Sequence, residues 1–451
     1  MASSRKSPPA EPLRASGAVD AAIAAAFREH LRPGMRVAVA LSGGVDSMVL
    51  LDAAAACAAR HSLSLSAIHV HHGLSPNAER WAQFCAAQCA ARGVPLATHR
   101  LRLLRRRGES LEALARNARY ACLQGADVDA VALAHHADDQ AETLLLQLLR
   151  GAGVQGLSAM ARYRPGRPAL LRPLLGLTRA TLAAYAAARR IAWIDDESNA
   201  ERRHARNFLR HEVAPLLAAR FPGYPATLVR AARHQAEASD LADALAVIDG
   251  ADALADGGLE RGRLCALPPP RARNLLRGFL RAEGLRPPSE ARLAEMLRQL
   301  RRAAPDANPR IAHDGAEIGC HRGRIMVHAP RSATFVRAWD GESELRLPGG
   351  SLVFERARGT GVAAAKLASA PVTLRSRCGG ERIRLAANRP TRSVKRLLQE
   401  AHMPPWERDA LPLVWSGEEL VAVPGIGVAL AYQAAPDEAG WCVQWRPLRP
   451  H

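Results

Sequence analysis

Residues 42–47, Ser-Gly-Gly-Val-Asp-Ser, have the residue types and the setting of a phosphate-binding loop. An apolar run precedes the loop and a helix-like stretch follows it, which indicates a strand, a tight turn and a helix start. Unpaired backbone N–H groups, the positive end of a helix dipole and two hydroxyl groups would then face one point. We predict that a nucleotide's phosphates are bound by Ser42, Gly43, Gly44, Val45, Asp46 and Ser47.

Asp46 indicates how this loop uses a nucleotide. A Walker A loop needs a lysine after its glycines, but the chain has lysines only at positions 6, 366 and 395, and none follows a glycine. A carboxylate beside bound phosphates is repelled unless a divalent cation lies between them. Asp46 therefore predicts a magnesium ion shared with the β- and γ-phosphates of ATP.

A second candidate group is the carboxylate pair Asp139 and Glu142, three residues apart at an expected helix start. This spacing places both side chains on one helix face. One carboxylate could orient a cationic amine while the other accepts its proton, so that the amine becomes a nucleophile. The alternative is ordinary capping, because acidic residues are favoured at the positive end of a helix. Spacing alone does not decide between the two.

Arginines recur at helical spacing within residues 110–124, beside an apolar helix face. Arg116 could neutralise an α-phosphate as negative charge develops on it, and Arg119 lies three residues further on. The alternative is a solvated helix face with an ion pair between residues four apart.

The candidate groups need a sheet to bring them together. Short apolar runs alternate with helix-like stretches after the loop, which predicts a parallel sheet covered on both faces, as in Rossmann-like domains. Ligands bind at the carboxyl ends of such strands, so residues 42–47 and 135–139 are expected to converge. The predicted strands span 35–41, 64–70, 95–101 and 130–134, and the predicted helices 48–59, 78–92, 110–124 and 138–149.

A chain of 451 residues exceeds one hydrophobic core, so several domains are expected. Proline and glycine mark boundaries near residues 221 and 347, with alanine, leucine and arginine at helical spacing between them. Short strands then surround one amphipathic helix. We expect a disordered tail at 1–17, an α/β nucleotide-binding catalytic domain at 18–220, a mainly helical domain at 221–345 and a small α+β domain at 346–451.

The charge balance indicates a polyanionic partner. Lysine and arginine number 62 against 43 acidic residues, for a formal net charge of +19, and nearly all of the basic residues are arginine. Arginine pairs with phosphate through two hydrogen bonds and stacks on bases, which suits RNA. GC-rich coding would explain arginine in place of lysine, but not the excess of positive charge.

The eight cysteines include no Cys-x-x-Cys pair, so we expect reduced thiols in a cytoplasmic protein rather than a zinc site or disulfides. No run of about 18 uncharged apolar residues occurs, so no membrane span is expected. The sequence leaves a homodimer open.

The loop resembles that of the ATP pyrophosphatase (PP-loop) superfamily, whose members cleave ATP between the α- and β-phosphates. A longer ordered series of motifs is similar to the tRNA(Ile)-lysidine synthetase family, strongly over residues 35–220, well near the C-terminus and only by position between. The motifs are residues 42–47, 70–74, 112–120, 135–151, 172–179, 193–199 with 206–207, 389–400, 404–408 and 421–425.

This resemblance implies a ligase that uses ATP to join free L-lysine to the wobble cytidine of the isoleucine tRNA with a CAU anticodon. In the family, ATP adenylates the ring carbonyl oxygen of the cytidine, pyrophosphate leaves, and the lysine ε-amine displaces AMP. The middle and C-terminal domains would grip the tRNA. By matched position, the catalytic residues would be Asp46, Arg116, Asp139 and Glu142, the lysine-binding residues His136, Asp139 and Glu142, and the tRNA or phosphate contacts Arg206, Arg210, Arg392 and Lys395.

Two positions depart from the family pattern. Phe208 follows Arg206-Asn207 where a basic residue is usual, and Ser75 stands where an arginine usually follows the glycine-leucine pair. A phosphate or RNA contact is therefore absent or moved. The rival interpretations are a tRNA thiolase with the same loop, which would need reactive cysteines, and an RNA-binding protein with a vestigial nucleotide site.

Binding of tRNA should weaken steeply with added salt, because neutralised phosphates release counterions. If six or more phosphates are contacted, affinity should fall by about a thousandfold or more between about 50 and about 200 mM salt. Filter binding across that range measures the slope, and a flat response would contradict the inference from charge.

Overall fold

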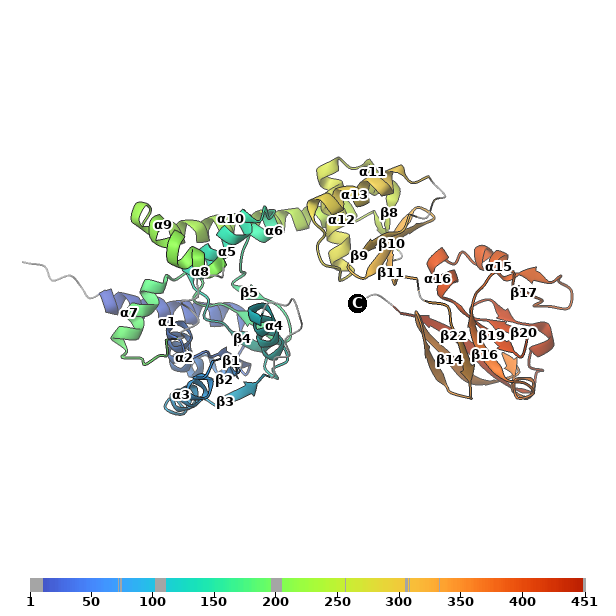
Figure 1. The fold of residues 1–451 in the computed structure, drawn as a ribbon, viewed down its shortest axis with the longest axis horizontal. Coiled ribbons are helices and arrows are strands. Elements are labelled where there is room, and N and C mark those ends of the chain that lie inside the picture. Colours follow the sequence, from blue (N-terminus) through green and yellow to red (C-terminus); the bar gives the residue numbers. More distant parts are fainter. Residues whose placement is uncertain are drawn as a thin grey trace, which may run out of the picture. The chain divides into compact units, whose positions relative to one another are not determined.

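The computed structural model describes residues 11–71, 73, 75–101, 111–195, 205–255, 257–304, 307, 309–331 and 333–448. The chain forms two compact units, which divide between Asp240 and Leu241 (Figure 1). Parts of the predicted features lie outside the described residues, namely positions 1–10 of the expected tail and positions 72, 74 and 196–199 of the family motifs.

A six-stranded sheet forms the centre of the first unit, in the order β3-β2-β1-β4-β6-β5. All neighbours pair in parallel except the edge strand β5, which is antiparallel to β6. The direction of strand order changes between β1 and β4, so a ligand crevice is expected at their carboxyl ends. The strands are β1 Arg36–Ala40, β2 Ser64–His71, β3 Leu96–Arg100, β4 Ala130–Ala132, β5 Tyr163–Arg164 and β6 Ala169–Leu171.

Alternation along β1 explains why helices cover both faces of this sheet. Val37 and Val39 point into one apolar core, while Ala38 points into a second core on the opposite face. Helices α1, α2 and α7 lie on the first face and α4 lies on the other (Figure 1). The helices of this unit are α1 Glu11–His30, α2 Val45–Ala58, α3 Ala78–Ala90, α4 Leu111–Gln124, α5 Ala137–Leu149, α6 Val154–Leu157, α7 Arg179–Ala188, α8 Ala205–Phe208, α9 Ala214–Arg220 and α10 Tyr224–Gly250, the last of which ends in the second unit.

The predicted strands and helices of this unit are confirmed, and so is the predicted α/β fold with a parallel sheet. The expected disordered tail is too long, because α1 begins at Glu11 and Ala15 is already buried in the core. One face of this helix packs into the core through the regularly spaced apolar residues Val19, Ile23 and Phe27. This packing also stabilises the helical turn that precedes them.

The second unit begins with helices and a five-stranded sheet of order β7-β8-β11-β10-β9, which share one core. The prediction of a mainly helical domain is therefore incomplete, because five strands share the core with the helices. The strands are short, so the helical spacing around them dominates the sequence pattern. The elements are β7 Leu254–Ala255, β8 Gly258–Glu260, α11 Arg261–Ala266, α12 Pro269–Ala282, α13 Glu290–Arg302, β9 Ile311–His313, β10 Ala316–His321 and β11 Arg324–His328.

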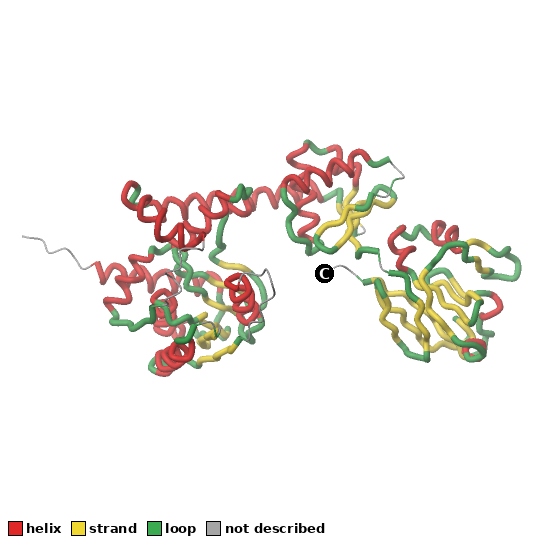
Figure 2. The backbone as a smooth tube through the Cα atoms, viewed as in Figure 1, coloured by secondary structure: helices red, strands yellow, loops and turns green. Residues whose placement is uncertain are grey.

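The C-terminal part of this unit is dominated by two sheets, β12-β16-β19-β20-β21 and β13-β14-β22-β15 (Figure 2). The expected boundary at residue 346 is wrong, because it cuts β13 and because β12 already pairs with β16. The remaining elements are β12 Val336–Trp339, β13 Glu344–Leu347, β14 Gly350–Arg358, β15 Val362–Ala363, α14 Ala364–Leu367, β16 Val372–Ser376, β17 Arg382–Ile383, β18 Arg392–Ser393, α15 Val394–Glu400, α16 Pro405–Ala410, β19 Pro412–Ser416, β20 Glu419–Val423, β21 Gly427–Val428 and β22 Ala439–Pro447.

All eight cysteines are free thiols, and four of them are buried. Burial, and to a lesser extent the neighbouring Cys89, raises the pKa of the Cys85 thiol to about 12. Such a thiol stays protonated and is a poor nucleophile at neutral pH. In the described part of the chain, none of the helices has the length and apolarity that a membrane crossing requires.

Candidate active site

The loop between β1 and α2 folds around the hydroxyl group of Ser47. This hydroxyl donates to the carbonyl oxygen of Gly44 at 2.9 Å and accepts the backbone N–H groups of Ser42 and Gly43, both at 3.2 Å. Gly44 immediately precedes α2, and no side chain caps that helix. The N–H groups of the first helical turn therefore remain for an anion, as a phosphate site requires.

Gly43 lets two other segments close against the loop. Its φ of +90° lies in the left-handed region, and a Cβ atom there would stand 3.0 Å from Cδ1 of Ile194 and 3.3 Å from the Cys85 sulfur. The backbone N–H of Ile194 donates to the carbonyl oxygen of Gly43 at 2.9 Å. A larger residue at position 43 would strain the backbone and press on both neighbours.

Asp46 lies in the first turn of α2 and lines a cavity of about 450 Å³. Its Oδ2 atom is 3.6 Å from Nε2 of His136, while Oδ1 is buried without a hydrogen-bond partner. Within the described ranges, no three His, Cys, Asp or Glu side chains are grouped to hold a metal ion. A magnesium ion beside Asp46 could take its other ligands from bound phosphate and water.

His136 connects the loop to the carboxylate pair. Its ring is 2% exposed and lies 3.4–3.6 Å from the carboxylates of Asp46, Asp138 and Asp139. Burial disfavours the protonated ring, but hydrogen bonds to Asp138 and Asp46 and the charge of Asp139 raise the pKa of His136 to about 10. The ring is therefore a cation at neutral pH. The 3.4 Å contact of Nδ1 with the Asp139 N–H contributes little, since a protonated Nδ1 cannot accept.

Asp139 and Glu142 are ion-paired with two arginines from the segment that follows α7. Arg206 donates Nε to Glu142 at 2.7 Å and Nη2 to Asp139 at 3.2 Å. Arg210 donates Nε to Glu142 at 2.7 Å and Nη2 to Asp139 at 3.1 Å. Glu142 is only 6% exposed, so this is a largely buried network with good geometry.

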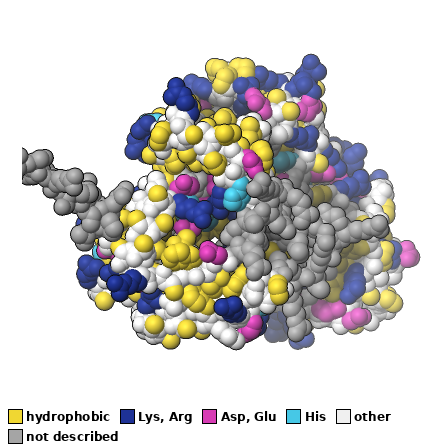
Figure 3. All heavy atoms as spheres, turned by 60° about the vertical axis from the view of Figure 1, so that its left-hand side comes forward, with side chains coloured by type: hydrophobic (Ala, Val, Ile, Leu, Met, Phe, Trp, Pro, Cys, Tyr) yellow, Lys and Arg dark blue, Asp and Glu magenta, His cyan; other side chains and the backbone are white. Residues whose placement is uncertain are grey.

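The capping interpretation of the carboxylate pair is confirmed for Asp139, while the binding of an amine by the pair stays a prediction. Asp139 caps α5, because its carboxylate accepts the backbone N–H of His136 at 3.1 Å, and the same carboxylate contacts both guanidinium groups. Arg210 lies in a π-helical turn, Leu209–Val213, which adds a residue to that turn and changes the direction of the side chains around it. Figure 3 shows basic, acidic and histidine side chains next to one another on one face of the molecule.

Arg116 and Arg119 occupy different environments on α4. Arg116 is exposed and its guanidinium lies over the Tyr120 ring, 5.2 Å from the centroid. Arg119 and Tyr120 line the cavity together with Ser42, Asp46 and Ser47, whereas Arg116 does not line it. Helical spacing alone could not separate the two arginines, because both lie on one side of the helix.

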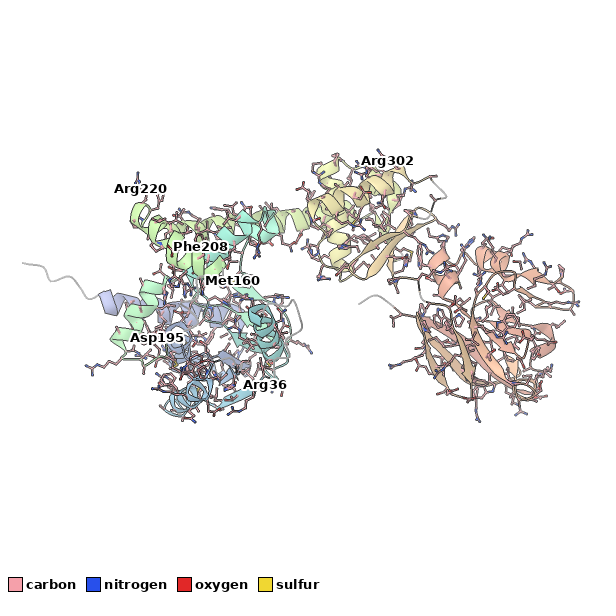
Figure 4. All side chains as sticks on the ribbon, viewed as in Figure 1. Arg36, Met160, Asp195, Phe208, Arg220 and Arg302 are labelled. Atoms are coloured by element: carbon pink, nitrogen blue, oxygen red, sulfur yellow. The ribbon has the colours of Figure 1, made fainter. Side chains whose placement is uncertain are left out.

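The two departures from the family pattern also differ in position. Ser75 lines the cavity, and its hydroxyl accepts the backbone N–H of Asn77 at 3.1 Å. Phe208 is half exposed on α8, where Figure 4 labels it, and in the sequence it stands between Arg206 and Arg210.

The residues predicted at positions 392 and 395 lie in the second unit, on and beside the helix α15. Arg392 is ion-paired with Glu400, and the side chain of Lys395 is exposed.

The parallel sheet, the glycine-containing loop at its switch point and the adjoining acid cluster define an ATP pyrophosphatase domain. A family model described as PP-loop domain matches residues 18–217. Further models, described as TilS substrate binding domain and TilS substrate C-terminal domain, match residues 259–326 and 372–445.

Most of the chain is similar to proteins named tRNA(Ile)-lysidine synthase. It is 44% identical to one from Nitrosomonas europaea over 93% of this chain and 94% of that protein. It is 43% identical to one from an Azoarcus species, over 94% of this chain and 96% of that protein. It is 39% identical to one from Coxiella burnetii, over 93% of this chain and 95% of that protein. The chain therefore belongs to the tRNA(Ile)-lysidine synthase family, which confirms the resemblance drawn from its motifs.

His136 should remain protonated through the physiological pH range. Its pKa of about 10, above the ordinary 6.5, means that protonation stabilises the folded site, and this contribution is lost as the pH rises towards 10. NMR titration of the ring signals, assigned with the variant His136→Gln, should show no protonation change between about pH 6 and about pH 8. A titration midpoint near the ordinary value would contradict the described contacts.

Proposed function

We propose that this chain catalyses ATP-dependent formation of lysidine, joining free L-lysine to the wobble cytidine of the isoleucine tRNA with a CAU anticodon. The observation that supports it most is the meeting, at one end of one sheet, of an intact phosphate loop and a buried carboxylate pair that holds cationic groups. The family membership of the chain supports the same reaction. We place the activity in the cytoplasm.

In the first step the ring carbonyl oxygen of the cytidine attacks the α-phosphate of ATP, and pyrophosphate leaves. The N–H groups of the loop and of the first turn of α2 would hold the phosphates of the leaving pyrophosphate. Asp46 would hold magnesium, and its buried, unpartnered Oδ1 fits a cation ligand. When bound, the ion neutralises charge on the β- and γ-phosphates, which makes pyrophosphate a better leaving group.

In the second step the lysine ε-amine attacks the carbon that carries the adenylated oxygen, and AMP leaves. Asp139 and Glu142 would bind the lysine ammonium group, and the guanidinium groups of Arg206 and Arg210 stand in for that cation in this structure. All four carboxylate oxygens already contact cations, so lysine would displace one guanidinium group. The displaced arginine is then available for phosphate, and a carboxylate can accept the proton that the amine must lose.

The second unit would bind the tRNA. Arg302 on α13 is exposed and can pair with a phosphate, and the exposed Arg271 and Arg298 would exchange their present partners, Asp249 and Glu295, for phosphates. We include Arg392 and Lys395 in this contact surface, because the second lies exposed on α15 and the first just before it.

A tRNA thiolase is the less supported alternative. Sulfur transfer needs an activated thiolate, but burial raises the pKa of the thiols of Cys57, Cys85, Cys89 and Cys320. The direct test incubates the pure protein with ATP, radiolabelled lysine and the CAU-anticodon transcript. Lysine incorporation supports the proposal, whereas sulfur incorporation, or no lysine transfer, would refute it.

The variant Asp46→Asn should lose pyrophosphate release, because it removes the charge that a cation beside the phosphates needs. Its affinity for tRNA should stay within about threefold, since the second unit and the basic surface are unchanged. Asp127→Asn is the matched control, because Asp127 is exposed and pairs only with Arg36 among the contacts described at the other end of the sheet. A collapse of tRNA binding in Asp46→Asn would give the loop a structural role instead.

The variant Glu142→Gln should still release pyrophosphate in the presence of tRNA but should transfer lysine at least about a hundredfold more slowly. Glutamine keeps the shape but cannot hold the ammonium as an ion pair or accept its proton. Pyrophosphate and labelled lysine are measured in parallel, with the exposed Glu237→Gln as control. Unchanged lysine transfer would remove Glu142 from the proposed role.

A further inference from the structure

A second cavity, with a volume of about 440 Å³, belongs to the second unit alone. Residues of the strands β10 and β11 and of the short helix α16 line it, together with neighbouring loop residues. We infer that this cavity binds an aliphatic ammonium group, supplied by a polyamine or by free L-lysine. This binding would be separate from lysidine formation, because the described lining residues of the cavity share no member with the proposed catalytic residues.

Contacts between α16 and the neighbouring sheet give this cavity a fixed wall. The Trp406 ring stacks on the His328 ring, with centroids 4.3 Å apart and planes 6° apart. Gly319 allows this contact, because a Cβ atom there would stand 2.5 Å from Cζ3 of Trp406. Nη2 of Arg310 donates to Oδ2 of Asp409 at 2.9 Å across the same junction. Stacking and an ion pair therefore hold the wall of the cavity in place.

The charge of the lining favours a cation. Four carboxylates line the cavity against two arginines, although the whole chain has a formal net charge of +19. Arg310 is already paired with Asp409, whereas no described residue forms an ion pair with Glu317 or Glu407. Burial raises the pKa of Glu407, as expected for a carboxylate that lacks a cation nearby. An ammonium group would supply the missing counter-charge. The carboxylates are those of Glu283, Glu317, Glu407 and Asp409, and the arginines are Arg310 and Arg331.

Two buried acceptor atoms in the lining lack a donor. Glu317 and His328 pair across β10 and β11, so their side chains lie on one face of the sheet. His328 is 6% exposed, and its Nδ1 donates to the carbonyl oxygen of Ala329 at 2.9 Å, because a carbonyl can only accept. Burial lowers the pKa of His328, so the ring is neutral and Nε2 is an acceptor. Nε2 of His328 and Oε2 of Glu317 are both buried without a hydrogen-bond partner, and an ammonium group carries three donors.

Other ligands suit this cavity less well. Of the residues that the structure describes, no three His, Cys, Asp or Glu side chains are grouped as metal ligands, and a phosphate would meet unpaired carboxylates. The apolar side chains of Met326, Val327 and Pro330 suit the methylene chain that carries an ammonium group in both polyamines and lysine. An unpaired RNA base is the remaining alternative, but His328 already covers one face of Trp406.

The experiment measures binding to the whole protein by equilibrium dialysis, with radiolabelled spermidine and radiolabelled L-lysine as separate probes. Lysine is measured in the Glu142→Gln background, which weakens the proposed substrate site. We expect saturable binding that Glu317→Gln and Glu407→Gln each weaken by about tenfold or more, because glutamine keeps the size but not the charge. Glu344→Gln, at an exposed position on β13, is the matched control and should leave binding unchanged. A polyamine ligand gives this pattern with spermidine, and an amino-acid ligand gives it with lysine.

Two outcomes would overturn the proposal. The first is that neither amine binds, or that both glutamine variants bind as the unaltered protein does. The second is that the trinucleotide CCA binds in place of an amine and is lost in Trp406→Leu, which would make the cavity a site for unpaired RNA bases. Thermal unfolding checks each variant, and removal of an unpaired buried charge should not lower stability, so Glu317→Gln and Glu407→Gln give two separate tests. Lysidine formation by the unaltered protein is assayed on its own, so the loss of this site and a failure of the proposed function are distinguished.

Discussion

The neutralisation of two buried carboxylates by arginines organises the first unit's active site. Asp139 and Glu142 begin α5, whereas Arg206 and Arg210 come from a segment more than sixty residues further along the chain. Because leaving any of these charges alone in a buried place would be costly, the network fixes α8 against α5 and gives each carboxylate a cationic partner. The sheet supplies the platform, but this network determines which charges face the cavity.

The close placement of acidic and basic side chains explains why one small region can hold both anions and cations. Three carboxylates raise the pKa of His136 and keep it protonated, whereas burial first, and then the charges of nearby arginines, lower the pKa of His135, its neighbour in sequence, and keep it neutral. Adjacent histidines thus have opposite protonation states, because the chain turns one of them towards the acidic cluster and the other towards the basic end of the cavity beside the loop, which Arg119 lines. The side chain of lysine is cationic and triphosphate is anionic. The acidic cluster suits the first and the loop with the basic end of the cavity suits the second, within one domain.

Much of this site follows from local sequence patterns, and the rest depends on contacts between distant segments. The strands, the loop at residues 42–47 and the helix start at Asp139 were predictable, because apolar alternation and glycine punctuation are local signals. The pairing of Arg206 and Arg210 with the carboxylates was not, since sequence spacing does not show which distant side chains meet. Arg119 and Arg116 were indistinguishable for a related reason, because burial depends on what packs over the helix. The α1 start and the strand β12 were missed because their partners lie elsewhere in the chain.

The absence of a side chain at Gly43 also lets the thiol of Cys85 lie close to the nucleotide loop. The Cys85 sulfur occupies the space beneath this glycine, and the thiol is fully buried there in its protonated form. A reagent that alkylates this sulfur needs the packing between α3 and the loop to open, and its adduct would then keep the two from closing again. The reactivity of Cys85 would therefore measure how often the packing between α3 and the nucleotide loop opens.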